Sequence, residues 1–221
     1  MRKIFTVAVC LFVFLAACKQ DDTTPPKFKM NGASTITISL NSPFNDPGVT
    51  AEDDEDGSVT VTNNISATNP DVNLVGHYII TYSATDAAGN TDQVTRDVFV
   101  VNDVAFLAGA YHTDTDSSTC GLNYTEGIIP STTVNNRIIF NEIGRCTNAN
   151  KKLMADIDFS TSTVTIVSDI INCGTFPLIA DRQFTGGGAL ASNNTVMDLD
   201  ITETILPSGA PVTCRYYFVK Q

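Results

Sequence analysis

The chain has 221 residues, 24 of them acidic and 13 basic, and a formal net charge of −11 at pH 7. An acidic surface repels nucleic acid and anionic lipid, so a role in binding phosphate-rich partners has no support. Its simplest consequence is solubility. The length suggests two domains of modest size.

The first residues have the order of a secretory signal. Arg2 and Lys3 form a short positive region, and residues 4–17 (IFTVAVCLFVFLAA) are uncharged and apolar. This run of 14 residues is shorter than the roughly 20 that a membrane-spanning helix needs. We therefore predict that residues 1–17 are a signal peptide. Its removal takes away two basic residues, so 11 basic and 24 acidic residues remain and the net charge becomes −13.

The end of this run resembles the lipobox of bacterial lipoproteins, in the residues Leu15-Ala16-Ala17-Cys18. Members of that class are cut before the cysteine, whose sulfur carries diacylglycerol. The resemblance implies that Cys18 is lipidated with acyl chains such as palmitate. Two or three acyl chains anchor a protein durably in a membrane, whereas a single acyl chain anchors it only marginally.

The stretch that follows, Lys19-Gln20-Asp21-Asp22, resembles the export signal that sends lipoproteins of Bacteroidota to the outer face of the outer membrane. It implies a lipid-anchored protein of the cell outer membrane that is exposed on the cell surface. Attachment facing the periplasm is the alternative. Residues 18–27 then form an acylated cysteine and a polar, proline-containing tether.

Residues 28–102 alternate between polar and apolar side chains in short runs bounded by turn residues, which is typical of a β-sandwich. The predicted strands cover residues 35–40, 58–62, 76–84 and 93–101. Ala88-Gly89-Asn90 supplies a tight turn, which allows the last two strands to pair as a hairpin.

Three stretches of this segment resemble bacterial Ig-like domains of the HYR type and of the type named after pesticidal crystal proteins. They are residues 45–51 (NDPGVTA), residues 56–61 (DGSVTV) and the run GHYIITYSATDAAGNTDQVTRDVFV. The resemblance implies an Ig-like sandwich that serves in spacing, adhesion or presentation.

Residues 103–221 are predicted to form an antiparallel β-meander of eight strands, barrel-like or sandwich, with one face of the sheet wet. The whole chain is thus expected to be all-β. The strand candidates are residues 107–115, 122–129, 137–143, 152–159, 163–169, 183–191, 195–205 and 212–219. Gly186-Gly187-Gly188 is interpreted as a bend or bulge. FLAGAYHTDTDSSTC and CRYYFVK resemble the C-terminal β domain of Bacteroidota surface lipoproteins, which implies architecture rather than activity.

Four cysteines remain in this second domain, and an even number in an exported chain predicts two disulfides. Their spacing contains no CxxC pair, which argues against a zinc site. An up-and-down order places Cys120, Cys146, Cys173 and Cys214 at one rim. If the sheet closes, the first and last strands are neighbours, which favours Cys120–Cys214 and leaves Cys146–Cys173. Other connectivities stay open.

The acidic run EDDED offers a weak calcium hypothesis through Asp53, Asp54 or Asp56, since Ca²⁺ prefers carboxylate oxygens. The alternative is a solvated loop. Only two histidines are present, His77 and His112, and they fall in different domains, so a Ser-His-Asp arrangement does not assemble. We expect no enzyme and no other cofactor.

The function expected from these features is noncatalytic binding or adhesion at the cell envelope, with the Ig-like domain as a stalk. The alternative is a glycan-binding accessory of a polysaccharide-uptake system, and a third possibility is a spacer without a ligand. Expected partners are the membrane, through the anchor, and either a glycan or an envelope protein. The chain has no tryptophan, so a sugar platform would depend on tyrosines. The candidates are Tyr111, Tyr124, Tyr216 and Tyr217.

Overall fold

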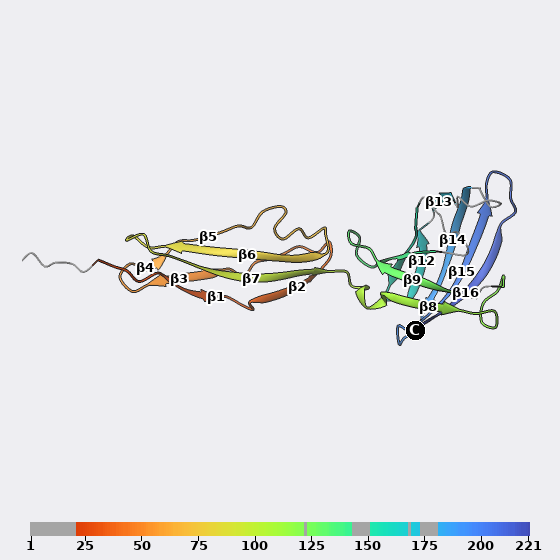
Figure 1. Cartoon of the computed structure of the whole chain (residues 1–221), viewed down its shortest axis with the longest axis horizontal. Helices are drawn as coiled ribbons and strands as arrows, with labels where there is room; N and C mark the ends of the chain where they lie inside the picture. The colour runs from red at the N-terminus through yellow and green to blue at the C-terminus, as the bar shows by residue number, and fades with distance from the viewer. Residues whose placement is uncertain (1–20, 122, 143–150, 168, 173–180) are drawn as a thin grey trace, which may run out of the picture.

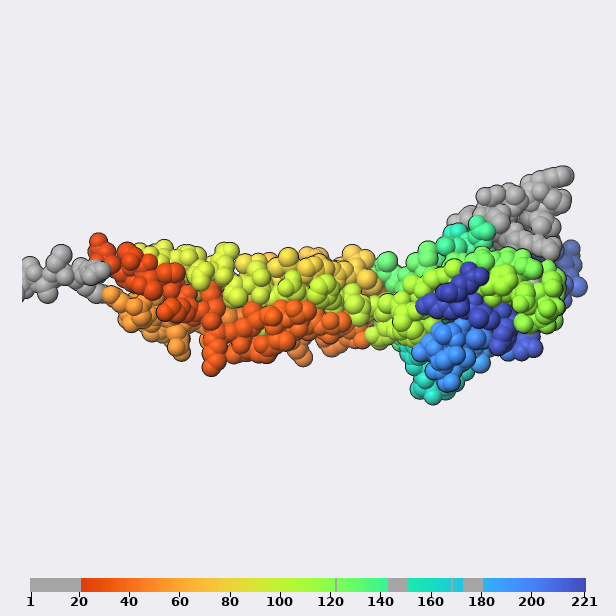
Figure 2. All heavy atoms as spheres, turned by 60° about the horizontal axis from the view of Figure 1, so that its bottom comes forward, coloured from red at the N-terminus to blue at the C-terminus, as the bar shows by residue number. Residues whose placement is uncertain are grey.

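The computed structural model describes residues 21–121, 123–142, 151–167, 169–172 and 181–221. Two β domains lie end to end along the long axis of the molecule, with the chain entering at the end remote from the second domain (Figure 1). The space-filling view in Figure 2 shows a slender first domain and a broader second one. Among the described residues, no helix is long and apolar enough to span a membrane.

The first domain consists of two sheets packed face to face. One contains β1 (Lys27–Met30), β3 (Val49–Asp53) and β4 (Gly57–Val59), and the other has the order β2-β7-β6-β5. The strands of this second sheet are β2 (Thr35–Ser39), β7 (Thr91–Val101), β6 (Gly76–Thr85) and β5 (Val61–Asn63). β2 runs parallel to β7, and the other pairs are antiparallel.

The predicted strand over residues 58–62 proved to be two strands. Its first half is β4, which pairs with β3, and its second half is β5, which pairs with β6 in the opposite sheet. The strand changes sheet at Thr60, as strands do at the corners of sandwiches. Alternation alone does not reveal such a corner, because both halves keep the same period.

The core of the sandwich includes Ile80, Tyr82 and Val98, which are almost fully buried. Alternation along β7 also turns Arg96 inward, where it is fully buried. Its guanidinium donates to the carbonyl oxygens of Asn31 and Ala33 at 2.8 and 2.7 Å. A buried arginine is tolerated when its donors are satisfied in this way, and here it ties the β1–β2 connection to β7.

The second domain is a closed barrel of antiparallel strands. The hydrogen-bonded order is β12-β11-β10-β9-β8-β16-β15-β14, and β12 also pairs with β14, which completes the ring. The strands are β8 (Gly109–Thr113), β9 (Tyr124–Pro130), β10 (Arg137–Phe140), β11 (Leu153–Asp158), β12 (Thr163–Val167), β14 (Asp181–Leu190), β15 (Val196–Ile205) and β16 (Val212–Lys220). A short 3₁₀ helix η1 (Ala105–Leu107) leads into β8. The predicted eight-stranded meander is confirmed, and the barrel is the form it takes.

The barrel differs from the prediction in one element, β13 (Asp169–Asn172), which pairs with β14 beyond β12. The register with β14 changes by one residue between the two segments: Thr165 is paired with Gly187, but Asp169 with Phe184. β12 and β13 therefore pair with the same edge of β14 in registers that differ by one residue. A register change of this kind is typical of a bulge, which increases local twist.

The three consecutive glycines lie in β14 where backbones approach closely. A Cβ atom on Gly188 would stand 1.9 Å from the carbonyl oxygen of Asp198 in β15, and one on Gly186 would stand 2.1 Å from that of Asp200. Gly186 also has a φ of 124°, which L side chains rarely adopt. These glycines let the sheet coil tightly enough to close.

Candidate functional site

The two domains meet through the β9–β10 loop, residues 131–136, which lies against the end of the Ig-like sandwich. The backbone N–H of Val75, in the loop before β6, donates to the carbonyl oxygen of Thr132 at 2.9 Å. The chain itself crosses at Asn102-Asp103, directly after β7. The contact is therefore held by a covalent crossing and by a separate loop-to-loop contact.

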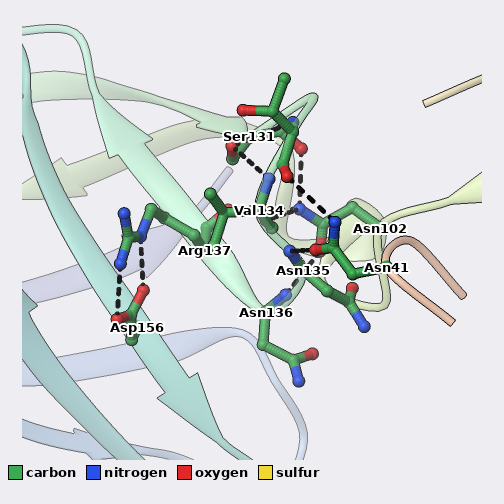
Figure 3. Close-up of polar contacts among 9 residues, drawn as sticks. Asn41, Asn102, Ser131, Val134, Asn135, Asn136, Arg137 and Asp156 are labelled. Carbon is green, nitrogen blue, oxygen red and sulfur yellow. Dashed lines mark hydrogen bonds and ion pairs between the residues drawn. The ribbon is translucent and has the colours of Figure 1, made fainter. Parts of the chain in front are cut away.

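Asn102 is the central side chain of this junction (Figure 3). It is 3% exposed, and its Nδ2 donates to the carbonyl oxygens of Ser131 at 2.8 Å and Val134 at 3.0 Å. Its Oδ1 accepts the backbone N–H groups of Val104 at 3.2 Å and Asn136 at 3.0 Å. The Asn102 amide thus supplies partners for both carbonyl and N–H groups of the β9–β10 loop. These backbone groups lie outside the strand ladders and would otherwise lack partners.

Asn41, at the end of β2, contacts the same loop from the Ig-like side. Its Oδ1 accepts the backbone N–H of Asn135 at 3.0 Å, and its Nδ2 lies 3.3 Å from the carbonyl oxygen of Thr133. Asn41 has a positive φ of 64°, which asparagine tolerates better than most residues. Asn135 in turn binds Asp103, whose Oδ2 accepts its Nδ2 at 2.8 Å.

Hydrogen bonds arranged in this way fix the orientation of the β9–β10 loop relative to the Ig-like domain. Each contributes about 0.5–1.5 kcal/mol, and several bonds from opposite sides of one loop resist bending in more than one plane. The arrangement is suited to holding the barrel in a set orientation on the Ig-like domain. It contains no nucleophile paired with a base.

The structure places two of the five predicted cysteine sites. Cys120, in the β8–β9 loop, and Cys214, in β16, form a disulfide with a sequence separation of 94 residues. This is the pairing expected from the first and last strands lying side by side. Cys18, Cys146 and Cys173 lie outside the described residues, so the lipidation and the second bridge stay predictions.

The three acidic residues of the weak calcium hypothesis lie at the end of β3 and in the turn that follows it, and they differ in burial. Asp53 ends β3 and is 7% exposed, whereas Asp54 and Asp56 are exposed. The Oδ2 of Asp56 accepts the backbone N–H of Ala87 at 2.6 Å. Asp53 also lies near Asp22 and Asp86, two residues that the sequence did not indicate as metal ligands.

The histidines and tyrosines do not assemble into a site. His77 is exposed and stacks on Phe99, with Nε2 2.6 Å from Oδ1 of Asp97. His112 is half-buried in β8, in the other domain.

Tyr111 and Tyr216 point into the barrel core, and burial raises the pKa of Tyr111 to about 12. Tyr124 packs against the same core, and of the four tyrosines only Tyr217 has its ring on the outer face of the sheet.

Glu126 is a buried carboxyl that the sequence reasoning missed. It is fully buried in β9, where burial raises its pKa to about 7. Its Oε1 accepts the backbone N–H of Glu142 at 2.8 Å, while Oε2 has no hydrogen-bond partner among the described residues. The signal was available in YTEGIIP, where position 126 shares a face with Ile128, but an acid at an inward position is not distinguishable from a register error.

Residues 28–100 match the family described as bacterial surface protein, Ig-like domain. A comparison with curated proteins found no match. Among solved structures, the chain is similar to the lipoprotein BT2262 from Bacteroides thetaiotaomicron. The identity is 17%, the TM-score is 0.35, and the similarity covers 89% of this chain and 100% of that one.

Two similarities involve Clostridium perfringens ZmpB. One is to its M60 catalytic domain with the CBM51-1 and CBM51-2 domains, at 15% identity and a TM-score of 0.27, covering 88% of this chain and 21% of that one. The other is to CBM51-2 in complex with GlcNAc and INT domains, at 14% identity and a TM-score of 0.26, covering 88% and 43%. At such TM-scores these similarities carry no weight for fold or ligand. Residues 28–100 are therefore similar to the Ig-like domain of bacterial surface proteins.

Proposed function

We propose that this chain is a lipid-anchored surface protein whose Ig-like domain acts as a stalk and whose barrel acts in noncatalytic binding or adhesion. The observation that carries the proposal is the hydrogen-bonded junction around Asn102 and Asn41 at the barrel end of the stalk. The described chain starts at the opposite end (Figure 1). A stalk that is tethered at one end and holds a domain rigidly at the other presents that domain away from its support.

The location is tested by protease treatment of intact cells. We expect the barrel to be lost from whole cells while a periplasmic control protein stays intact. Cys18→Ser should release the protein from the envelope fraction. A chain that survives on intact cells would overturn surface display, and Cys18→Ser protein that stays with the envelope would overturn the lipid anchor.

The presentation role is tested by single-molecule energy transfer in the full chain. Dyes are placed through unnatural amino acids at Thr95 on the stalk and at Val212 on the barrel, both exposed. The wild type should give one narrow distribution. Asn41→Gly keeps the positive φ but removes the contacts to the β9–β10 loop, so the distribution should broaden.

Asn194→Gly is the matched control, because Asn194 has a φ of 58° in the β14–β15 turn and its backbone N–H donates to the carbonyl oxygen of Ala191 within that turn. It should leave the distribution unchanged. A broad wild-type distribution would overturn the rigid stalk. Binding to a glycan array by the full chain would instead favour the glycan-binding alternative, in which case the ligand would lie elsewhere than on a platform of the four predicted tyrosines.

A further inference from the structure

Three carboxylates from distant parts of the chain meet at the end of the Ig-like domain where the tether enters. Asp22 belongs to the tether, Asp53 ends β3, and Asp86 follows β6. One oxygen from each lies within 4.8 Å of the other two. Figure 1 places this end, marked by β3 and β4, at the opposite pole from the barrel.

Asp53 brings an unsatisfied charge to this cluster. Its Oδ1 accepts the backbone N–H groups of Glu55 at 2.9 Å and Asp56 at 3.0 Å. Its Oδ2 is buried and has no hydrogen-bond partner among the described residues, although the side chain is 7% exposed. A buried carboxylate oxygen without a partner is costly, and native proteins keep one mainly where a ligand or ion satisfies it.

The second buried member, Asp86, adds a further negative charge. It is also 7% exposed, and its two oxygens accept the backbone N–H and Nδ2 of Asn90, both at 2.7 Å. Within the described part of the chain, no ion pair joins Asp22, Asp53 or Asp86 to a lysine or arginine. Three carboxylates at this spacing repel one another unless a cation lies between them.

The surrounding contacts hold the three acids together. The Oδ2 of Asp56 accepts the backbone N–H of Ala87 at 2.6 Å, which joins the β3–β4 turn to the β6–β7 turn. The Nδ2 of Asn90 lies 2.7 Å from Oδ2 of Asp86 and 3.2 Å from the carbonyl oxygen of Asp22. The tether is thereby already positioned beside the two turns.

We propose that Asp22, Asp53 and Asp86 bind Ca²⁺ at the base of the stalk. Ca²⁺ takes oxygen ligands at about 2.3–2.6 Å in flexible geometry, so it can bridge carboxylates within the observed spacing, with water completing its shell. Mg²⁺ has shorter bonds and loses water reluctantly. The bound ion pins the tether to the Ig-like domain, which orders the chain between the predicted anchor and the stalk.

The test is calorimetric titration of the full chain with CaCl₂ at constant ionic strength, together with thermal unfolding in CaCl₂ and in chelator. Calcium sites of extracellular modules have a Kd of about 0.1–1 mM, and we expect binding in that range. Saturating Ca²⁺ should raise the Tm of the Ig-like domain by about 4–8 °C. A flat titration and an unchanged Tm at 10 mM CaCl₂, about ten times the weakest expected Kd, would overturn the site.

Asp53→Asn keeps Oδ1 as acceptor for the turn and should weaken Ca²⁺ binding by at least about tenfold. Asp22→Asn, in the tether, should weaken binding similarly without affecting the folded core. The matched control is Asp54→Asn, an adjacent exposed residue whose change removes the same charge and should leave the affinity unaltered. Equal weakening by Asp54→Asn, or tighter binding of MgCl₂ than of CaCl₂, would refute the assignment.

Discussion

Asn102 and Arg96 each satisfy backbone groups that lie outside any strand ladder. Asn102 serves the β9–β10 loop at the junction, and Arg96 serves the β1–β2 connection in the sandwich. Both are buried polar side chains at the places where segments distant in sequence meet. Their role follows from a rule of protein interiors, namely that buried backbone groups need partners.

Asn102→Ala should lower the free energy of unfolding by about 2–3 kcal/mol, because it leaves buried carbonyl and N–H groups without partners. Asn193→Ala, at an exposed turn position with one local hydrogen bond to the N–H of Thr195, should cost less than about 1 kcal/mol. Urea unfolding of the full chain measures both. Equal costs would mean that the junction amide contributes no more than a surface turn.

The buried carboxyl of Glu126 should make barrel stability depend on pH. Because burial raises its pKa in the fold to about 7, above the ordinary value of 4.5, the folded barrel binds a proton that the unfolded chain has released. Stability is therefore fully present below pH 4.5 and is lost as the pH rises through 7, by up to about 3 kcal/mol. Glu126→Gln should be more stable than the wild type at pH 8 and about equal at pH 4.

Urea unfolding over this pH range tests the Glu126 prediction. Glu142→Gln is the control, because Glu142 is an exposed carboxylate beside the buried one and its charge is the smaller cause of the raised pKa. The control should keep most of the pH dependence. A Glu126→Gln variant that tracks the wild type across the range would show that this carboxyl is not the responsible group.

At the scale of elements, alternation predicts most of the strands but not β1 or β3, and it does not show where a strand changes partner. The run over residues 58–62 reads as one strand and divides between two sheets, and the run from Thr163 continues past β12 into β13. A corner and a bulge both preserve the local preference for extended backbone. Their positions depend on which neighbouring strand offers hydrogen-bond partners.

Gly188→Ala should cost at least about 2 kcal/mol of unfolding free energy, because the added Cβ would overlap the carbonyl oxygen of Asp198 and force β14 and β15 apart. Thr185→Ala in the same strand removes atoms instead of adding them and should cost less. Thermal unfolding compares the two variants. A Gly188→Ala barrel as stable as the wild type would mean that the close approach is dispensable.

At the scale of the whole molecule, two features join parts of the chain that are remote in sequence. The Cys120–Cys214 bond links the β8–β9 loop to β16, and the β9–β10 loop links the barrel to the Ig-like domain. The disulfide restricts motion between the β8–β9 loop and β16, and the loop contact restricts motion between the two domains. The proposed calcium site would do the same at the other end of the Ig-like domain.

The double variant Cys120→Ser/Cys214→Ser should lose about 3–5 kcal/mol of stability, since the bond closes a loop of 94 residues and restricts the unfolded chain. Urea unfolding without reductant compares it with the wild type. Reductant added to the double variant should cause a further loss if Cys146 and Cys173 are joined as predicted. An unchanged stability of the double variant would contradict the expected contribution.

Local pattern in the sequence determined the all-β class, the eight strands of the meander and the inward faces, as in β15, where Met197 and Leu199 are buried. Side-chain alternation is a property of neighbouring residues, so a single sequence carries it. The signal, the lipobox and the anchor at Cys18 also rest on local sequence, and they remain predictions.

Tertiary structure alone decided which residues meet at the ends of the domains. Asp22, Asp53 and Asp86 lie together because the segment before β1 and two separate turns reach the same end of the sandwich. Asn41 contacts Asn135 because a barrel loop lies against the end of the Ig-like domain. Such meetings depend on the order of strands and on closure of the barrel, which are set by pairing between segments far apart in the chain and leave no periodic trace in the sequence.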